Sequence, residues 1–147
     1  MMEMAKLAER AVEAAKIWKL DLDYTAQSLE GLDRLAQKIC VMHLLQPLPE
    51  DILTGTANLF GAYLGEVLLR CGLEEMGFTW TEGEEGEIGI GKPDFWMAPV
   101  TKVYKRITKG PEHSLFDFFD CVFGLVIGAV DPMTDPRMRV VSEPEAE

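Results

Sequence analysis

Hydrophobic residues recur every three or four positions along the first half of the chain, with charged residues between them. Such spacing predicts amphipathic helices. The first is predicted over residues 3–20, the second over 25–45 and the third over 51–71. The apolar face of the first consists of Met4, Leu7, Ala8, Ala11, Val12, Ala15 and Trp18. Two prolines, Pro47 and Pro49, end the second.

Two glycines, Gly61 and Gly65, stand four residues apart inside the third predicted helix. Each costs about 1 kcal/mol relative to alanine in a helix interior. A notch that lets another stretch of backbone approach closely would offset this cost. The membrane-helix interpretation of the same spacing does not apply, because Glu66 and Arg70 interrupt the apolar run.

After the third helix the pattern changes to alternation, and residues 77–98 predict a small antiparallel sheet of two or three strands. A short helix is predicted over 100–107. The last helix, over 114–129, has more apolar residues than one narrow face can hold. It is therefore either central to the core or half of a subunit interface, with Phe119 and Phe123 as candidate contacts. The predicted fold class is α+β, with three N-terminal helices and a hydrophobic C-terminal helix around the sheet.

The length of 147 residues indicates one domain. We expect a single α+β domain over residues 1–130, followed by a Pro-rich acidic tail over 131–147. The formal net charge of −11 disfavours nucleic-acid binding, because phosphate groups are repelled by an acidic surface.

The start of the chain has no basic segment followed by an uninterrupted apolar stretch, as a secretory leader would have. The most apolar segment, 121–130, has ten residues, which is too short to cross a bilayer. Cys40, Cys71 and Cys121 are odd in number and widely spaced, which is typical of unpaired thiols in a reducing compartment. We therefore expect a cytoplasmic protein that binds neither membranes nor nucleic acids.

Residues 86–92 match the Gly-x4-Gly-Lys core of a phosphate-binding loop. That chemistry needs a hydroxyl residue next and then a helix whose N-terminus faces the phosphates. Here Pro93 takes the place of the hydroxyl residue, and the glutamates of residues 82–87 would repel a nucleotide. A strand with glycine kinks is the favoured interpretation.

Two groups of side chains have spacings that suit metal binding or acid–base chemistry. Cys40 and His43 share one helical face, which supplies half of a zinc site. His113, Asp117 and Asp120 are spaced i, i+4, i+7, so on one continuous helix they share a side and can hold a cation or move protons. Against these roles, a core thiol beside a hydrogen-bonded imidazole explains the first pair. Asp117 also suits a helix N-terminus. We expect neither a metal nor a cofactor.

Four basic residues recur at three- or four-residue spacing and can form one stripe: Lys102, Lys105, Arg106 and Lys109. The stripe is either a solvated helix face or a docking patch for an acidic partner, which includes the acidic hairpin of a second copy. Arg106 is also a candidate ion-pair partner of Glu66, on the helix with the notch glycines.

The segment Gly61-Ala-Tyr-Leu-Gly-Glu-Val67, the strand around Trp80, and the segment from Pro99 to Pro111 form a recognisable set. Together they resemble small bacterial proteins of unassigned function, over roughly residues 51–125. In those proteins a Gly-x-Tyr-x-Gly-Glu helix precedes a short sheet and a Pro-x-x-Lys-Val-x-Lys-Arg helix. The resemblance implies no catalytic residues. Some such proteins look like immunity or regulatory partners of other bacterial proteins, and the hairpin and tail are more acidic here.

The leading functional hypothesis is a non-catalytic interaction module, built around the last helix, whose partner is a second copy of the chain or another protein. It rests on the apolar excess of that helix, on the separated acidic and basic segments, and on the lack of an assembled catalytic set. The alternative is a small metal-binding protein or hydrolase that uses His113, Asp117 and Asp120.

Overall fold

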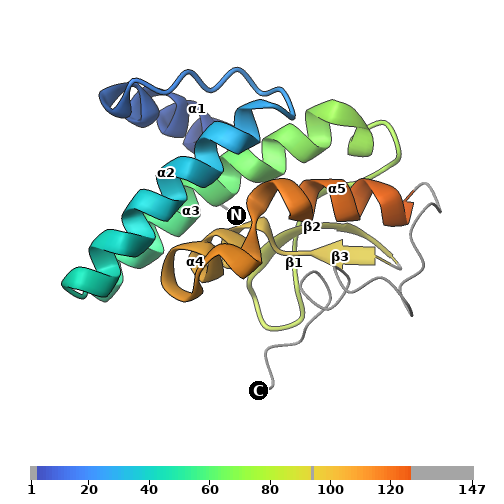
Figure 1. The fold of residues 1–147 in the computed structure, drawn as a ribbon. Coiled ribbons are helices and arrows are strands. Elements are labelled where there is room, and N and C mark those ends of the chain that lie inside the picture. The colour runs from blue at the N-terminus through green and yellow to red at the C-terminus, as the bar shows by residue number, and fades with distance from the viewer. Residues whose placement is uncertain (1–2, 94, 127–147) are drawn as a thin grey trace.

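The protein is an α+β structure with a small antiparallel sheet, as predicted. The computed structural model describes residues 3–93 and 95–126, so the expected tail over 131–147 lies outside the described residues. The elements in chain order are α1 (Met4–Ala15), α2 (Ser28–Leu45), α3 (Glu50–Leu68), β1 (Thr79–Glu82), β2 (Ile88–Lys92), β3 (Phe95–Met97), α4 (Pro99–Lys109) and α5 (Leu115–Val126). Figure 1 shows them as a ribbon.

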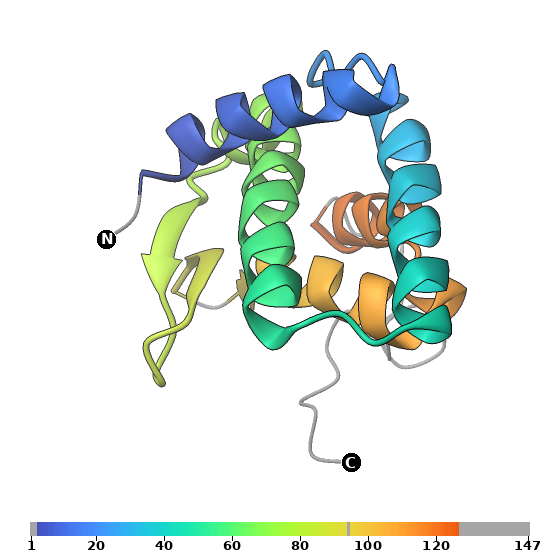
Figure 2. The ribbon, with the colours of Figure 1, turned by 90° about the vertical axis from the view of Figure 1, so that its left-hand side faces the viewer.

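Helix α3 is the central element of the fold. Figure 2 shows the sheet on one side of α3 and α2 on the other, with α1 crossing at one end of the α2–α3 pair and α4 at the opposite end. Helix α5 packs against α2 and α4. Every residue from Phe60 to Leu69 is buried, because α3 has neighbours on all sides in this stretch.

The length and composition of α3 and the turn after it also raise the question of whether this stretch crosses a membrane. The stretch Glu50–Leu73 is long and apolar enough to cross a membrane by length and composition, and 67% of its most apolar window is buried inside the protein. Among residues 3–93 and 95–126, this is the one stretch with that length and composition. A helix in the core of a protein also needs apolar side chains on most of its surface, so burial inside the protein accounts for the apolar composition of this stretch.

The first and last helices differ from the predicted ranges. The prediction of one helix over 3–20 is wrong at its C-terminal end: α1 stops at Ala15, and a 3-10 turn, Lys16–Trp18, ends at Lys19 in the left-handed conformation with φ of 60°. Helix α5 begins at Leu115, one residue after the predicted start, and residues 127–129 of the predicted helix lie outside the described part.

The sheet has the strand order β1-β2-β3, with both pairs antiparallel. Strand β2 contains the glycines of the segment that matches a phosphate-binding loop. That segment is a strand rather than a loop that opens a helix, so the strand interpretation is confirmed. Gly91 pairs with Trp96, and Cβ atoms at Gly89 and Gly91 would collide with the Trp96 indole. These glycines therefore make room for the indole against β2.

The notch predicted on α3 exists, with two different occupants. A Cβ atom at Gly61 would collide with the Cα atom of Val100, in the first turn of α4, so a neighbouring backbone does approach closely here. At Gly65 the space is filled by the Trp80 indole from β1. The two glycines thus set how close α4 and the sheet can lie to α3.

We expect Gly61→Ala to lower the free energy of unfolding by about 1–3 kcal/mol, because the added methyl group must push α4 away from α3. Gly55→Ala is the matched control on the same helix, since a Cβ there meets no atom within 4 Å. The control should raise stability by up to about 1 kcal/mol through helix propensity. Urea unfolding of both variants measures the difference; equal effects would show that Gly61 is not a packing position.

Candidate functional site

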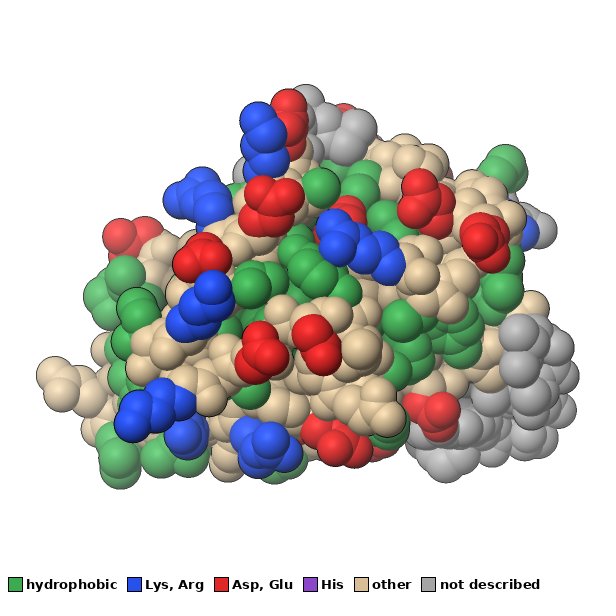
Figure 3. Space-filling model, turned by 90° about the horizontal axis from the view of Figure 1, so that it is seen from above, with side chains coloured by type: hydrophobic (Ala, Val, Ile, Leu, Met, Phe, Trp, Pro, Cys, Tyr) green, Lys and Arg blue, Asp and Glu red, His purple; other side chains and the backbone are tan. Residues whose placement is uncertain are grey.

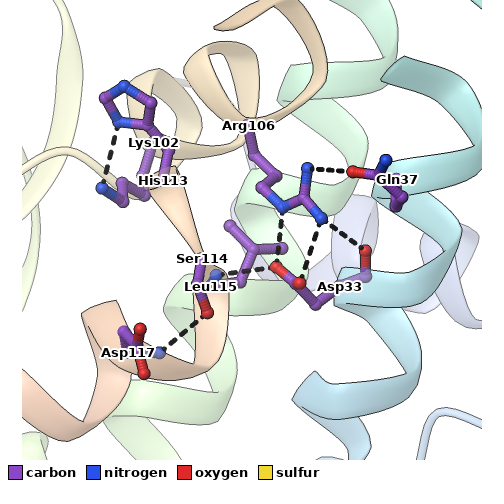
Figure 4. A network of polar contacts seen from close by, with 8 residues as sticks. All are labelled: Asp33, Gln37, Lys102, Arg106, His113, Ser114, Leu115 and Asp117. Atoms are coloured by element: carbon purple, nitrogen blue, oxygen red, sulfur yellow. Dashed lines mark hydrogen bonds and ion pairs between the residues drawn. The ribbon is translucent and has the colours of Figure 1, made fainter. Parts of the chain in front are cut away.

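His113 does not share a helix with the two aspartates. It lies in a 3-10 turn, Pro111–His113, and Ser114 has an extended backbone (φ −52°, ψ 132°) that separates this turn from α5. The i, i+4, i+7 spacing therefore does not place the three side chains on one face, and that prediction is wrong. Asp117 and Asp120 are exposed on α5, and Figure 4 shows the His113 ring directed away from Asp117.

The His113 imidazole is 7% exposed, and its Nδ1 atom lies 3.3 Å from the ammonium of Lys102. A protonated Lys102 can only donate, so Nδ1 is the acceptor in that state. Burial lowers the pKa of His113 from its usual value of 6.5, and the nearby charges of Lys102 and Lys105 lower it further. The lowered pKa disfavours a role for His113 in proton transfer at neutral pH. Its Nδ1 atom is also already in contact with Lys102.

The Cys40–His43 pair also has an internal role. Cys40 is buried, and Nδ1 of His43 accepts a hydrogen bond of 3.0 Å from the backbone N–H of Leu48, across the turn that follows α2. Among residues 3–93 and 95–126, no group of three or more His, Cys, Asp or Glu side chains is placed to hold a metal ion. The Cys40–His43 half-site thus gains no further ligand in this part of the chain.

The predicted basic stripe is not an exposed face. Lys102, Lys105 and Arg106 are only 4%, 6% and 3% exposed, whereas Lys109 is exposed. Helix α4 packs against both α2 and α3, so most of its circumference is covered, and its basic side chains are enclosed between neighbours. The interpretation of this stripe as a solvated face or a docking patch is corrected for these three residues.

Arg106 forms the main buried ion pair among the described contacts. Its Nε and Nη2 atoms donate to the two carboxylate oxygens of Asp33 at 2.9 and 3.1 Å, and Nη1 donates to Gln37 at 2.9 Å. The same Asp33 carboxylate accepts the backbone N–H of Leu115 at 2.8 Å. Figure 4 shows how these contacts join α2, α4 and the start of α5.

The predicted Glu66–Arg106 pair is wrong, because the two side chains lie on different sides of α3. Glu66 is buried on the side that faces the sheet. Its carboxylate accepts one hydrogen bond from the Trp80 indole N–H at 2.9 Å and another from Nε of Arg70 at 3.2 Å. The Arg70 guanidinium in turn lies 3.8 Å from the ring centroid of Tyr24. Glu66 therefore fastens β1 to α3 and has no contact with Arg106.

Tyr63, the tyrosine of the Gly-x-Tyr-x-Gly-Glu motif, is fully buried. Its hydroxyl accepts the N–H of Tyr24 at 2.8 Å and lies 2.6 Å from the Ser28 hydroxyl. Tyr24 has a positive φ of 67°, a conformation that a non-glycine residue adopts only when its surroundings hold it there. Tyr63 thus fixes the segment that leads into α2, which is a structural role for this motif.

The aromatic residues of α5 are used in packing. Phe119 and Phe123 are half-buried against the core with their ring centroids 4.8 Å apart, and Phe118 and Val122 are buried. Of the two alternatives for this helix, its described contacts match the one in which it belongs to the core.

A surface that the sequence analysis did not single out lies where α2 ends and α3 begins. Five large apolar side chains there are exposed. They are Val41 (39%), Met42 (46%), Leu44 (73%), Leu45 (82%) and Ile52 (49%), and we call them the α2–α3 patch. Surface apolar residues that occur singly need no explanation, whereas several at one helix end, as with the four on α2, favour a binding site.

The patch has a signal in the sequence. Residues 39–45 contain no charged side chain, so the last two turns of α2 are apolar on nearly all sides. Only one side of a helix end can face its own core, where Cys40 is buried. The remaining apolar side chains must project outward, which a helical projection of this stretch would have revealed.

The interior beside the patch offers no cavity. The space among α2, α3 and α4 is closed by apolar side chains and leaves no room for a water-sized molecule; its lining is Leu32, Leu35, Ala36, Ile39, Thr56, Phe60, Val103, Ile107 and Leu115. Figure 3, which views the molecule from above, shows acidic, basic and hydrophobic side chains interspersed, so this face has no continuous region of one charge. The five members of the α2–α3 patch are all apolar, so the chemistry that they offer is apolar contact.

Comparison of the chain with protein-family models, curated proteins and solved structures gave no match.

We expect Arg106→Met to lower the free energy of unfolding by about 3–5 kcal/mol, because it leaves the Asp33 carboxylate without its cationic partner. Lys16→Met removes the exposed Glu13–Lys16 pair and is the control, with an expected change within about 0.5 kcal/mol. Chemical unfolding of both variants checks this. A small loss for Arg106→Met would mean that the buried pair does not hold the helices together.

The lowered pKa of His113 predicts an acid-sensitive contribution to stability. The unfolded chain binds the proton at higher pH than the folded chain, so stability falls as the pH drops through 6.5 toward the lower folded pKa and is fully present above 6.5. His113→Gln keeps an acceptor for Lys102 but cannot titrate. Its urea midpoint should change less between pH 7.5 and pH 5.5 than that of the original protein; parallel pH profiles would contradict the assignment.

Proposed function

We propose that the chain is a non-catalytic protein-interaction module that binds its partner protein through the α2–α3 patch. The exposure of Leu44 and Leu45, at 73% and 82%, is the observation that carries the proposal. The proposed surface uses other residues than α5 and the basic stripe, on which the sequence-based hypothesis was built.

The energetics of the patch favour binding to an apolar protein surface. Covering each of its two most exposed leucines removes apolar area from water and contributes roughly 1–2 kcal/mol. Val41 and Leu45 lie one turn apart on the same face of α2, with Met42 and Leu44 on its two flanks, so a partner that covers this face contacts both leucines. Central apolar residues of this kind dominate protein interfaces.

The polar side chains with catalytic potential support the same conclusion. His113 is bonded to Lys102, and His43 to the backbone after α2. The carboxylates of Asp33 and Glu66 are bonded to Arg106 and to Trp80 and Arg70, respectively. These groups act in holding the fold, whereas five of the nine exposed large apolar side chains of the described surface belong to the patch. A regulatory or immunity-like role in the bacterial cytoplasm, as the resemblance implies, is the setting we propose.

Site-specific photo-crosslinking in cells tests the proposal. A photoreactive phenylalanine derivative at position 45 should give an adduct of defined mass with a protein partner. The same group at position 17 is the control, because Ile17 is also 82% exposed but lies in the 3-10 turn Lys16–Trp18, before α2 begins. The absence of an adduct at position 45, or the same adducts from both positions, would overturn the proposed function.

A further inference from the structure

We propose that the outward face of the sheet, around Trp96, is a second docking surface, and that its occupant is an arginine-bearing basic segment of a partner protein. The inference goes beyond the proposed function, because it uses residues of the sheet and none of the α2–α3 patch. The position of the Trp96 ring, the glutamates beside it and the charge of the chain support it.

The pairing of the strands identifies the outward face. Successive side chains of a strand point to opposite faces, and residues that pair across strands share a face. Ile90 pairs with Trp80, and both side chains lie against α3. The next residue, Gly91, pairs with Thr79 and Trp96 and therefore lies on the face that looks away from α3. Figure 2 shows this sheet at the edge of the molecule.

The Trp96 indole covers β2 on this face, in the space that side chains at two glycines would occupy. A Cβ atom at Gly89 would collide with the ring, and one at Gly91 would stand 2.7 Å from its Cδ1 atom. The ring is 38% exposed although one side of it is held against the strand. A partner thus meets an indole whose position is already set, and tryptophan is among the residues that contribute most to binding at interfaces.

A carboxylate borders the same ring. The Cβ position of Gly83, in the turn between β1 and β2, lies 3.0 Å from Cζ2 of Trp96 and 3.0 Å from Oε1 of Glu87, so the ring and the carboxylate are neighbours. The backbone N–H of Glu85 donates to Oε1 of Glu87 at 3.2 Å and holds the carboxylate there.

The charges beside Trp96 are acidic. Four glutamates in and next to the turn are exposed, and none of them forms an ion pair within residues 3–93 and 95–126; they are Glu82, Glu84, Glu85 and Glu87. The one basic residue of the three strands, Lys92, alternates with Gly91 and so belongs to the face toward α3. Its ammonium lies 5.1 Å from the centroid of the Phe78 ring.

An aromatic ring beside a carboxylate attracts a cation. The face of an indole attracts a positive charge within about 6 Å of its centroid, and the carboxylate pairs with the same charge. Arginine suits this combination better than lysine, because its planar guanidinium stacks on a ring while its N–H groups donate to a carboxylate. The protein already contains one such arrangement, in which the Arg70 guanidinium lies over the Tyr24 ring and donates to Glu66.

The charge of the whole chain favours the same occupant. With a net charge of −11, the protein attracts basic partners and repels acidic ones at long range. At an ionic strength of about 0.15 M charges are screened beyond about 8 Å, so a specific site must supply close contacts. The Trp96 ring and the Glu87 carboxylate supply them, and binding should be measured at this ionic strength.

Titration of the full ¹⁵N-labelled chain with a short peptide in which arginine alternates with threonine tests the inference. We expect the indole N–H resonance of Trp96 to shift, while that of Trp18, which is 44% exposed, stays in place. A matched peptide with citrulline, which keeps the shape of arginine without its charge, should bind about 10-fold more weakly. No shift at Trp96, or equal affinity for the two peptides, would overturn the inference.

Substitutions locate the site. Glu87→Gln keeps an acceptor for the Glu85 N–H and should weaken the arginine peptide about three-fold. Glu30→Gln removes the same charge from the exposed side of α2 and should leave the affinity unchanged. Trp96→Leu keeps an apolar side chain over the glycines of β2 but lacks the ring face, so it should also weaken binding about three-fold. Equal losses in the two glutamine variants, or no loss in Trp96→Leu, would mean that the net charge alone attracts the peptide, and the site would be wrong.

Other occupants are outcomes of the same titration. Arg137 and Arg139 of this chain lie outside the described residues. Tighter peptide binding after Arg137→Gln and Arg139→Gln would show that these arginines compete for the site, which overturns a partner segment as its occupant. Leu45→Glu should leave peptide binding unchanged, and a loss there would place the peptide on the α2–α3 patch and overturn the inference. The crosslink from position 45 tests the proposed function independently of these results.

Discussion

The buried contact between Arg106 and Asp33 is the interaction on which the arrangement of the helices depends. A guanidinium that is 3% exposed is stable in the interior only if its N–H groups are hydrogen-bonded and its charge is paired with an opposite charge. Asp33 and Gln37 on α2 supply these partners, 73 and 69 residues away in sequence. The carboxylate also accepts the first N–H of α5, so one side chain sets the positions of three helices.

Helix α3 positions the sheet and α4, as the Arg106–Asp33 contact positions α2, α4 and α5. Small residues on α3 face both neighbours: Gly61 admits the backbone of α4, and Gly65 admits the Trp80 ring. The indole N–H then meets the buried carboxylate of Glu66, so shape and hydrogen bonding specify the same position for β1. This explains why a glycine pair that costs helix propensity stands in the most buried helix of the protein.

Much of the fold could be predicted from periodicity alone. The ranges of α2 and α3 were predicted to within three residues at each end, because their apolar repeats and the prolines between them are local signals. The prediction of the first helix failed at Lys19, where a single residue ends the helical stretch without a proline or glycine. The last helix was predicted to within one residue at its start, but His113, which precedes it in a separate 3-10 turn, was wrongly assigned to its face.

The partners of charged residues could not be predicted, for a different reason. A basic residue on an amphipathic helix is ordinarily assigned to water, and that assignment is reversed when a distant carboxylate enters the core with it. Nothing near Arg106 in the sequence indicates Asp33 rather than Glu66; only the packing of α2 against α4 decides between them. The burial of the basic stripe follows from the same packing.

The same constraint bears on the exposed apolar side chains at the end of α2, where we propose the binding surface. The hydrogen bonds that tie α2 to α4 and α5 are made by Asp33 and Gln37, in its first ten residues, whereas its last turns continue beyond them. Those last turns are uncharged over seven residues, although a free helix end would be expected to carry basic side chains that favour its dipole and its solubility. Leu44 and Leu45 stand in these positions instead, so the helix end has the composition of a surface that is covered.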